Sequence, residues 1–219
     1  MTEPPLGLRE SKKRRTRLAI SEHAVRLFIA RGFEATTVAE VAAAARVAKK
    51  TVTNYFPRKE DLALDFQEEF IASLAVTARS RASGTPVLTA LRVRHREDVR
   101  DHAATAGFSS SDFARMIADS PTLTARLREL HELRERALAE ALAESGPAER
   151  GGGDRGGDRD GLGTRAVAAH LATAHRVLFQ RVQELSLAGL PPHAIADTVT
   201  EEAQQVFDLL EPSFGGYGS

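Results

Sequence analysis

The 219-residue sequence predicts an all-α protein of about nine helices. Apolar residues recur at the 3.6-residue period of a helix face along most of the chain, and the long apolar/polar alternation of half-buried strands is absent. Apolar residues form 42% and charged residues 27% of the sequence, which is typical of a globular protein with its own core. We therefore expect a domain of three short helices at the N-terminus, followed by a helical bundle.

The first helices are bounded by local start and stop signals. Ile20 and Phe28 lie on one apolar stripe of the first helix, and Gly32 ends this helix by supplying the left-handed C′ position that a side chain would resist. Thr37 and Glu40 have the spacing of a capping box, which predicts that the second helix begins at Thr37. Proline, glycine and serine separate the later helices. The predicted helices after the first cover residues 37–44, 49–56, 59–81, 86–103, 109–118, 121–144, 164–188 and 192–211.

We predict two domains, residues 1–58 and 59–211, and a flexible tail over 212–219. Within the second domain, residues 145–164 contain eight glycines and almost no apolar side chain. Such a segment cannot bury enough surface to offset its ordering entropy, so we predict a disordered linker. The alternative, a phosphate-binding loop, needs a preceding strand, and the sequence predicts none.

Charge is distributed very unevenly along the chain. The formal net charge is zero, but residues 1–60 have a net charge of +7 and contain all five lysines, whereas residues 61–219 have a net charge of −7. This asymmetry predicts a polyanionic partner for the N-terminal segment alone. Chance clustering of charges on a solvated surface is the alternative.

Several classes of protein are disfavoured by composition and motifs. The absence of cysteine excludes disulfides, thiolate zinc sites and cysteine nucleophiles. No apolar run approaches the ~18 residues of a membrane span, and the first residues lack the apolar core of a signal peptide, so we expect a cytoplasmic protein. The sequence has no nucleophile–base–orienter set and no cofactor fingerprint. We therefore predict no enzymatic activity, no catalytic residue, and no metal or cofactor.

Residues 37–56 are predicted to form two short helices joined by a tight turn, preceded by a third helix. This is the arrangement of a helix-turn-helix unit. In such a unit the second helix packs on the first through apolar residues, while its polar face enters the major groove of DNA. The predicted packing residues are Val38, Val41, Val47 and Val52.

The polar face of the helix over residues 49–56 carries side chains that can bind DNA. Threonine and asparagine can hydrogen-bond to base edges, and lysine can reach guanine acceptors or phosphates. Tyr55 can either contact a phosphate or act as a core ring with a hydrated hydroxyl. The residues on this face are Lys49, Lys50, Thr51, Thr53, Asn54 and Tyr55.

This pattern resembles the TetR (tetracycline-repressor-like) family of bacterial regulators. A weaker likeness over residues 116–123 is typical of actinobacterial members. The resemblance implies a homodimer with an N-terminal DNA-binding domain and a helical body that binds a ligand and forms the dimer. The residues that match the family pattern are Ala24, Leu27, Phe28, Gly32, Phe33, Thr36, Thr37, Val38, Val41, Ala42, Val47, Thr51, Val52, Asn54, Tyr55, Phe56, Lys59, Glu60, Asp61 and Leu62.

By motif position, the helix over residues 49–56 is the recognition helix, and Thr37 and Lys59 lie at helix N-termini that bind phosphates. A helix N-terminus suits a phosphate oxygen because its N–H groups are unpaired and its dipole is positive. The full set of candidate DNA-contacting residues is Thr36, Thr37, Lys49, Lys50, Thr51, Thr53, Asn54, Tyr55 and Lys59.

Two residues depart from the family pattern at the turn before the recognition helix. Arg46 stands where the turn usually has glycine, and Ala48 stands where the helix usually has a serine cap. A left-handed arginine costs about 1–2 kcal/mol and a missing cap about 1 kcal/mol. Lys49 and Lys50 also lie at the helix end whose dipole repels cations. We hypothesise that DNA phosphates relieve this strain; the alternative is that Arg46 adopts an ordinary turn.

The N-terminus is rich in basic residues. They can form an arm that follows the DNA backbone or enters the minor groove, or they can be a merely solvated helix start. These residues are Arg9, Lys12, Lys13, Arg14, Arg15 and Arg17.

The last two predicted helices carry apolar stripes, which the resemblance assigns to a four-helix dimer interface. A recognition helix that reads one half-site also needs a twin about 34–36 Å away, so a two-fold dimer and a pseudo-palindromic operator are expected together. The alternative is that the stripes only close the core of one chain. The candidate interface residues are Val167, Leu171, Leu178, Val182, Leu185, Ile195, Val199, Val206, Phe207 and Leu210.

A ligand pocket is expected inside the central helices, although each candidate can equally be a core residue. His131 and Arg134 can orient an anionic group such as a carboxylate, or pair with Glu135 or solvent. His95, Asp98 and His102 share a helix face that permits a metal, but a solvated face is the simpler interpretation. The candidate ligand residues are Phe108, Phe113, Met116, Ile117, Leu127, His131, Arg134, His175 and Phe179.

The leading hypothesis is a ligand-released homodimeric repressor that binds a pseudo-palindromic operator in double-stranded DNA. A small-molecule effector of unknown identity would favour a body conformation in which the recognition helices no longer match the DNA grooves. The alternative is a DNA-binding regulator whose bundle docks a protein partner, or one that acts as an activator.

Overall fold

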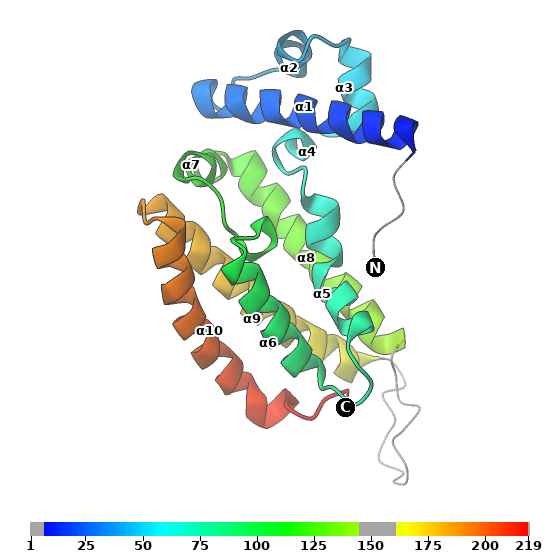
Figure 1. Cartoon of the computed structure of the whole chain (residues 1–219), viewed down its shortest axis with the longest axis vertical. Helices are drawn as coiled ribbons and strands as arrows, with labels where there is room; N and C mark the ends of the chain where they lie inside the picture. The colour runs from blue at the N-terminus through cyan, green and yellow to red at the C-terminus, as the bar shows by residue number, and fades with distance from the viewer. Residues whose placement is uncertain (1–6, 145–160, 219) are drawn as a thin grey trace. The chain divides into compact units, whose positions relative to one another are not determined.

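The computed structural model describes residues 7–144 and 161–218 of the chain (Figure 1). Within these ranges it contains ten α-helices, one short 3-10 helix and no strand, so the all-α prediction is confirmed. The chain forms two compact units. The N-terminal unit comprises residues 1–65 and 115–126, and the bundle unit comprises residues 66–114 and 127–219. The N-terminal unit is thus longer than the predicted domain over 1–58 and takes up a second, distant segment.

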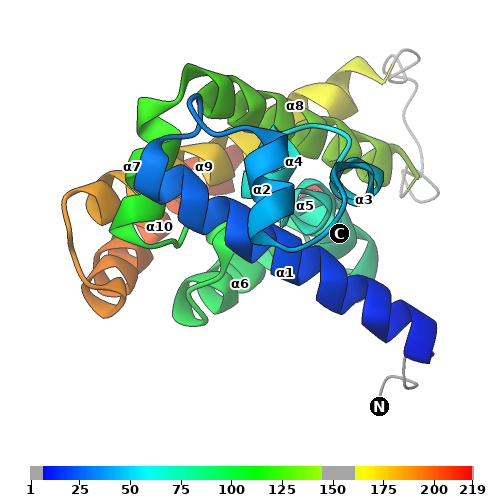
Figure 2. The same cartoon turned by 90° about the horizontal axis from the view of Figure 1, so that it is seen from above.

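The N-terminal unit is built on one long helix, α1 (Leu8–Arg31). Three short helices follow, α2 (Val38–Ala44), α3 (Lys49–Tyr55) and α4 (Glu60–Ala63), and α1 contacts both α2 and α4 (Figure 2). The end of α7 (Ser111–Asp119) and the start of α8 (Pro121–Glu144) belong to the same unit. Its apolar core contains Ile20, Ala24, Phe28, Phe33, Val41, Val52, Phe56, Leu62 and Leu123.

The basic N-terminal residues are part of α1 rather than an arm. No glycine or proline interrupts the chain between Leu8 and Arg31, so the first helix continues backwards from its apolar stripe through the basic segment. The side chains from Arg9 to Arg15 are exposed, whereas Arg17 is half-buried. These residues therefore begin α1 on an exposed surface, and their contact with DNA stays a prediction.

The predicted long helix over residues 59–81 is broken into α4 and α5 (Gln67–Ser80). Leu62, Ala63 and Leu64 are all buried, at 1%, 4% and 1% exposure. Leu64 has a φ of −108° and a ψ of 48°, which lie outside the helical region. The backbone therefore leaves the helix at this buried residue.

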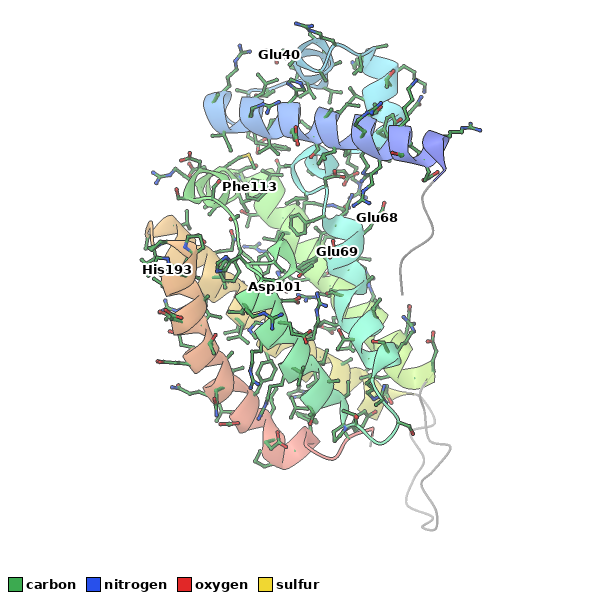
Figure 3. All side chains as sticks on the ribbon, viewed as in Figure 1. Glu40, Glu68, Glu69, Asp101, Phe113 and His193 are labelled. Carbon is green, nitrogen blue, oxygen red and sulfur yellow. The ribbon has the colours of Figure 1, made fainter. Side chains whose placement is uncertain are left out.

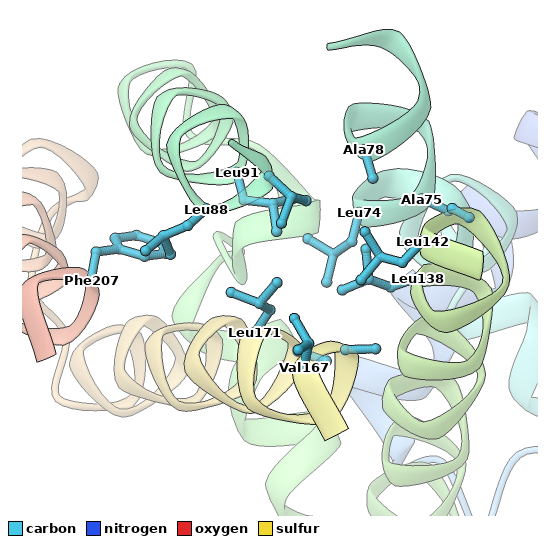
Figure 4. Packing of buried hydrophobic residues seen from close by; sticks show 14 of the residues in the cluster. Leu74, Ala75, Ala78, Leu88, Leu91, Leu138, Leu142, Val167, Leu171 and Phe207 are labelled. Carbon is cyan, nitrogen blue, oxygen red and sulfur yellow. The ribbon is translucent and has the colours of Figure 1, made fainter. Parts of the chain in front are cut away.

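The bundle unit surrounds an apolar core formed by five helices. Besides α5 and most of α8, it contains α6 (Val87–Arg100), the 3-10 helix η1 (Ala104–Ala106), α9 (Leu162–Leu187) and α10 (Pro192–Phe214). Figure 4 shows that buried side chains from α5, α6, α8, α9 and α10 meet in one cluster. This cluster includes Leu74, Leu88, Leu91, Leu138, Leu142, Val167, Leu171 and Phe207.

Most of the predicted dimer residues are already buried within the single chain, so these stripes close its own core. Their exposure is 8% or less for Val167, Leu171, Leu178, Val182, Leu185, Ile195, Val199 and Phe207, and Val206 and Leu210 are half-buried against the same core. The stripes face α5, α6 and α8 because a helix with one apolar face buries that face in its own bundle first. The outward faces instead carry Val177 and Leu187 of α9 and Leu209 of α10.

The C-terminal residues also differ from the prediction of a flexible tail over 212–219. Helix α10 continues to Phe214, and Tyr217 packs on the bundle. The Tyr217 carbonyl accepts a hydrogen bond of 3.1 Å from the Val87 N–H at the start of α6. Residues 145–160 of the predicted linker lie outside the described residues, and residues 162–164 belong to α9.

Because Leu171 is a core residue of the single chain, its truncation should destabilise the monomer fold. We expect Leu171→Ala to lower the free energy of unfolding by about 2–5 kcal/mol, whereas Val177→Ala on the exposed side of α9 should change it by about 0.5 kcal/mol or less. Urea denaturation of both variants at equal protein concentration checks this. Equal costs for the two variants would contradict the burial of Leu171.

Candidate nucleic-acid interface

Helices α2 and α3 form the predicted helix-turn-helix unit. Val41 and Val52 are fully buried, and Val38 and Val47 are half-buried, so the predicted packing residues lie inward. The turn between the helices is closed by a hydrogen bond of 3.0 Å from the Val47 N–H to the Ala42 carbonyl. Burial of Val52 fixes which face of α3 points outward.

The capping box that predicted the start of α2 is present. The Thr37 hydroxyl accepts a hydrogen bond from the Glu40 N–H, and the Glu40 carboxylate accepts one from the Thr37 N–H at 2.7 Å (Glu40 is labelled in Figure 3). The hydrogen bonds from Thr37, chiefly that of its backbone, lower the pKa of the Glu40 carboxyl. The N-terminus of α2 is therefore held in shape by its own residues.

The turn before α3 has the unfavourable backbone that the sequence suggested. Arg46 has a φ of +54°, in the left-handed region that favours glycine. Ala48 is the N-cap of α3 and supplies no side-chain cap. Lys49 and Lys50 occupy the first turn of α3, where the helix dipole repels cations. Three locally unfavourable features thus lie within five residues of the sequence.

The outward face of α3 is polar. Lys49, Lys50, Thr53 and Asn54 are exposed, whereas Thr51 and Tyr55 are half-buried. The Thr53 hydroxyl donates to the Lys50 carbonyl within the helix at 3.1 Å. These residues form one side of a short helix whose opposite side, at Val52, is in the core.

Two of the predicted DNA-contacting side chains are engaged elsewhere. Thr36 is 1% exposed and its hydroxyl donates to the Gly32 carbonyl at 2.9 Å, so we remove it from the candidate interface. The Lys59 ammonium donates to the carbonyls of Phe33 at 2.5 Å and Glu34 at 3.4 Å, and it lies 4.3 Å from the Phe33 ring centre. Lys59 therefore anchors the loop that follows α1 instead of presenting a free ammonium group.

A guanidinium that the sequence did not single out holds the end of α3. Arg17 of α1 donates to the Tyr55 carbonyl at 3.2 Å and to the Asp65 carboxylate at 2.6 Å. Its guanidinium also lies 4.7 Å from the Phe56 ring centre. Arg17, which the sequence placed among the residues of a possible arm, thus connects α1 with α3 and with the segment before α5.

The residues 115–126 are tied to the N-terminal unit by polar contacts. The Ser120 hydroxyl donates to the Glu34 carboxylate at 2.7 Å, and this bond lowers the pKa of Glu34. The buried Asp61 carboxylate accepts the Arg58 N–H at 3.1 Å and forms an ion pair with Arg126 at 3.3 Å. These partners are separated by up to 86 residues, so no local pattern could have predicted them.

The predicted ligand residues are divided between the two units. Met116 and Ile117 belong to the N-terminal unit, whereas the other candidates belong to the bundle unit. Phe108 packs in a separate apolar cluster with Val99 and Val182. Phe113, labelled in Figure 3, is half-buried at the start of α7, and Leu127 is half-buried on α8.

The remaining candidates do come together, with partners that sequence reasoning missed. His131 lies 5.0 Å from the Phe70 ring centre and 5.1 Å from that of Phe179. Arg134 is 4% exposed and lies 4.5 Å from the Phe70 ring centre. His175 lies 5.4 Å from His95 on α6. We call these four residues, His95, His131, Arg134 and His175, the buried basic cluster.

Burial keeps the histidines of this cluster neutral. Desolvation, with a smaller contribution from the Arg134 charge, lowers the pKa of His95 to about 4 and that of His131 to about 3. Desolvation also lowers the pKa of His175 well below its ordinary value. Each ring therefore offers one N–H donor and one nitrogen acceptor at neutral pH.

The simpler interpretation of His95, Asp98 and His102 as a solvated face is wrong. His95 and Asp98 are buried, and His102 is exposed beyond the last residue of α6 with a φ of +51°. Within residues 7–144 and 161–218, no group of three His, Cys, Asp or Glu side chains could hold a metal ion. None of the helices in these ranges has the length and apolarity needed to span a membrane.

The fold and the exposed polar face of α3 define a protein with a helix-turn-helix DNA-binding domain. Residues 20–66 match the family described as bacterial regulatory proteins, tetR family. The likeness to this family covers the helices from α1 to α4. This family is described as one of regulatory proteins, which agrees with the predicted class of a DNA-binding regulator.

Two relatives illustrate the similarity. The HTH-type transcriptional regulator TcmR of Streptomyces glaucescens is 34% identical over 146 residues, which are 63% of this chain and 63% of TcmR. A solved structure named as a TetR-family transcriptional regulator of Mesorhizobium loti aligns with a TM-score of 0.50 and 16% identity, over 89% of this chain and 96% of that one. The second likeness concerns the fold alone.

The left-handed Arg46 generates a prediction about stability. We expect Arg46→Gly to raise the free energy of unfolding by up to about 1 kcal/mol, because glycine adopts a positive φ without steric cost. Ala45→Gly is the control, since Ala45 has a φ of −80° and should lose about 0.5–1 kcal/mol on substitution. Chemical denaturation of both variants measures this. A loss of stability in both would show that Arg46 is not strained.

The neutral histidines predict a pH dependence. Unfolded histidine binds a proton below pH about 6.5, whereas folded His95 does so only near pH 4, so the free energy of unfolding should fall as the pH is lowered from 6.5 to 5. A single histidine contributes up to about 1.4 kcal/mol per pH unit in this window. We expect His95→Gln to reduce the slope of the free energy of unfolding against pH. The control His193→Gln, at an exposed position of α10 (Figure 3), should reduce this slope less. Urea denaturation at several pH values checks this, and an unchanged slope in His95→Gln would contradict it.

Proposed function

We propose that this chain is a homodimeric repressor that binds a pseudo-palindromic DNA operator by inserting α3 into the major groove. The observation that carries the proposal is the division of α3 into two faces. Val52 is fully buried, while Lys49, Lys50, Thr53 and Asn54 are exposed. A short helix held in this way can present its side chains to base edges without unfolding any part of the core.

The lysines at the start of α3 support a role in binding phosphate. They lie where the helix dipole disfavours them, next to an uncapped N-terminus and a left-handed arginine. A phosphate oxygen would accept hydrogen bonds from the unpaired N–H groups and neutralise the lysine charges. The features that weaken the free domain would then become favourable in the complex.

A dimer is proposed because one α3 reads one half-site, and a two-fold operator needs a second copy one duplex turn away, about 34–36 Å. The apolar stripes of α9 and α10 are in the core, so we place the dimer contact on the outward faces of these helices. Val177 is 47% exposed, Leu187 is 37% exposed and Leu209 is 80% exposed. We further propose that a small molecule bound in the bundle unit releases the operator by favouring another conformation of the dimer.

The decisive experiment begins by selecting bound sequences from random duplex DNA with the full chain. We expect inverted repeats among the selected sequences. The affinity of Lys49→Ala/Lys50→Ala for such a sequence should be lower, and its dependence on salt should weaken by about one counterion for each lost phosphate contact. Thermal stability should stay the same or rise, because two cations leave the positive end of the helix dipole.

The matched control is Arg96→Ala/Arg100→Ala, which removes the same charge from exposed positions of α6. This variant should keep the wild-type salt dependence. Lower stability of the lysine variant with unchanged DNA affinity would overturn the role of α3. Selected sequences without two-fold symmetry would overturn the dimeric operator.

A further inference from the structure

The buried basic cluster contains a guanidinium that no carboxylate of the described residues contacts by a hydrogen bond. Arg134 is 4% exposed, and within the described residues its guanidinium makes one hydrogen bond, from Nε to the Ser73 hydroxyl at 2.9 Å. A guanidinium has five N–H donors. Burying such a group without a carboxylate partner is strongly unfavourable, so natural proteins rarely do so without a further use for it.

The carboxylate that stabilises the Arg134 charge, Asp98, already has other partners. The Asp98 carboxylate lies 2.5 Å from the Arg94 guanidinium and also accepts a hydrogen bond from the Thr105 hydroxyl at 3.5 Å. It acts on Arg134 only through its charge and forms no hydrogen bond with it among the described contacts. Asp98 therefore leaves the remaining N–H donors of Arg134 without a carboxylate in hydrogen-bonding contact.

The charge of Arg134 acts on three imidazole rings that have unsatisfied nitrogens. The Nε2 atoms of His95, His131 and His175 are buried and have no hydrogen-bond partner in the described part of the chain. His95 and His175 are only 4% and 5% exposed. A buried polar atom without a partner is unfavourable, so a ligand that bonds to these nitrogens would recover the lost hydrogen bonds.

The walls of the cluster are aromatic. Phe70 contacts Arg134, His131 and Phe179, with ring centres 5.5 Å apart in the last pair. Phe207 lies 5.7 Å from His95 and 5.5 Å from His175. A flat aromatic body would pack against such rings in the edge-to-face geometry that they already adopt.

An open groove on the bundle unit shares one residue, Ser73, with the surroundings of the cluster. It lies between α5 and α6 and has a volume of about 570 Å³. Ser73 lines the groove and also accepts the hydrogen bond from Arg134, so one side chain contacts both. Glu69 and Glu97 also line the groove, and their negative charges help to raise the pKa of Arg94. Glu69 is labelled in Figure 3.

We propose that the buried basic cluster binds a hydroxylated aromatic anion, with Arg134 holding the anionic group and the histidines bonding to its hydroxyls. This inference rests on the proposed function, because it names the chemical class of the molecule that releases the DNA. The anion supplies the missing partner of Arg134, and neutral imidazoles can donate to or accept from a hydroxyl. The molecule enters through the groove at Ser73.

The test compares two probes of the same shape, 3-hydroxy-2-naphthoate and its neutral amide, by calorimetry on the full chain without DNA. We expect the naphthoate to bind at least about tenfold more tightly than the amide, since hydrogen bonds to a charged group are worth more than those to a neutral one. Arg134→Met should weaken naphthoate binding about tenfold to a hundredfold and reduce the preference over the amide. The naphthoate affinity of Arg134→Lys should lie between those of the wild type and Arg134→Met, because lysine keeps the charge but lacks the planar guanidinium.

The control is Arg136→Met on the exposed side of the same helix, which should bind the naphthoate as the wild type does. Equal affinity of the wild type for both probes, or no binding of either, overturns the inference. This result would leave DNA binding untouched, since operator affinity is measured without any probe. Conversely, a chain that prefers the naphthoate but binds no selected DNA would overturn the proposed function and keep the anion site. The wild-type comparison of probes stands even if Arg134→Met fails to fold.

Discussion

One guanidinium ties together the segments that position the DNA-binding helix. Arg17 of α1 donates to the Tyr55 carbonyl at the end of α3 and to Asp65, and it lies over the ring of Phe56. The last carbonyls of a helix have no partner within the helix, so a charged donor at this end both satisfies them and favours the dipole. The orientation of α3 therefore depends on a residue more than thirty positions away in the sequence.

The two ends of α3 differ in how their backbone polar groups are satisfied. The C-terminal end is satisfied by Arg17, whereas the N-terminal end has no side-chain cap, two lysines and a left-handed arginine before it. The fold thus stabilises the C-terminal end of this short helix. It leaves unsatisfied the N-terminal end, which we propose contacts phosphate. Locally unfavourable choices that gather at one place are typical of functional surfaces, because the rest of the structure must compensate for them.

Local signals in the sequence predicted local structure well and long-range structure poorly. The capping box of Thr37 and Glu40 and the positive φ of Gly32 were predictable because each depends on a few adjacent residues. The burial of Thr36 and the carbonyl contacts of Lys59 were not, since each partner is set by tertiary packing. Periodicity correctly marked Leu171 and Val199 as apolar positions, but a stripe cannot tell whether its own bundle or a second chain will cover it.

The bundle unit differs from the N-terminal unit in where its unsatisfied groups lie. The N-terminal unit exposes them at the start of α3, where water can solvate them in the free protein. The bundle unit buries Arg134 and three imidazole nitrogens among aromatic rings, where water is excluded. A bound molecule can change the conformation of a protein only through a difference in its affinity for two states. Buried groups that lack partners supply such a difference most strongly, because satisfying them stabilises the one arrangement in which they surround the ligand.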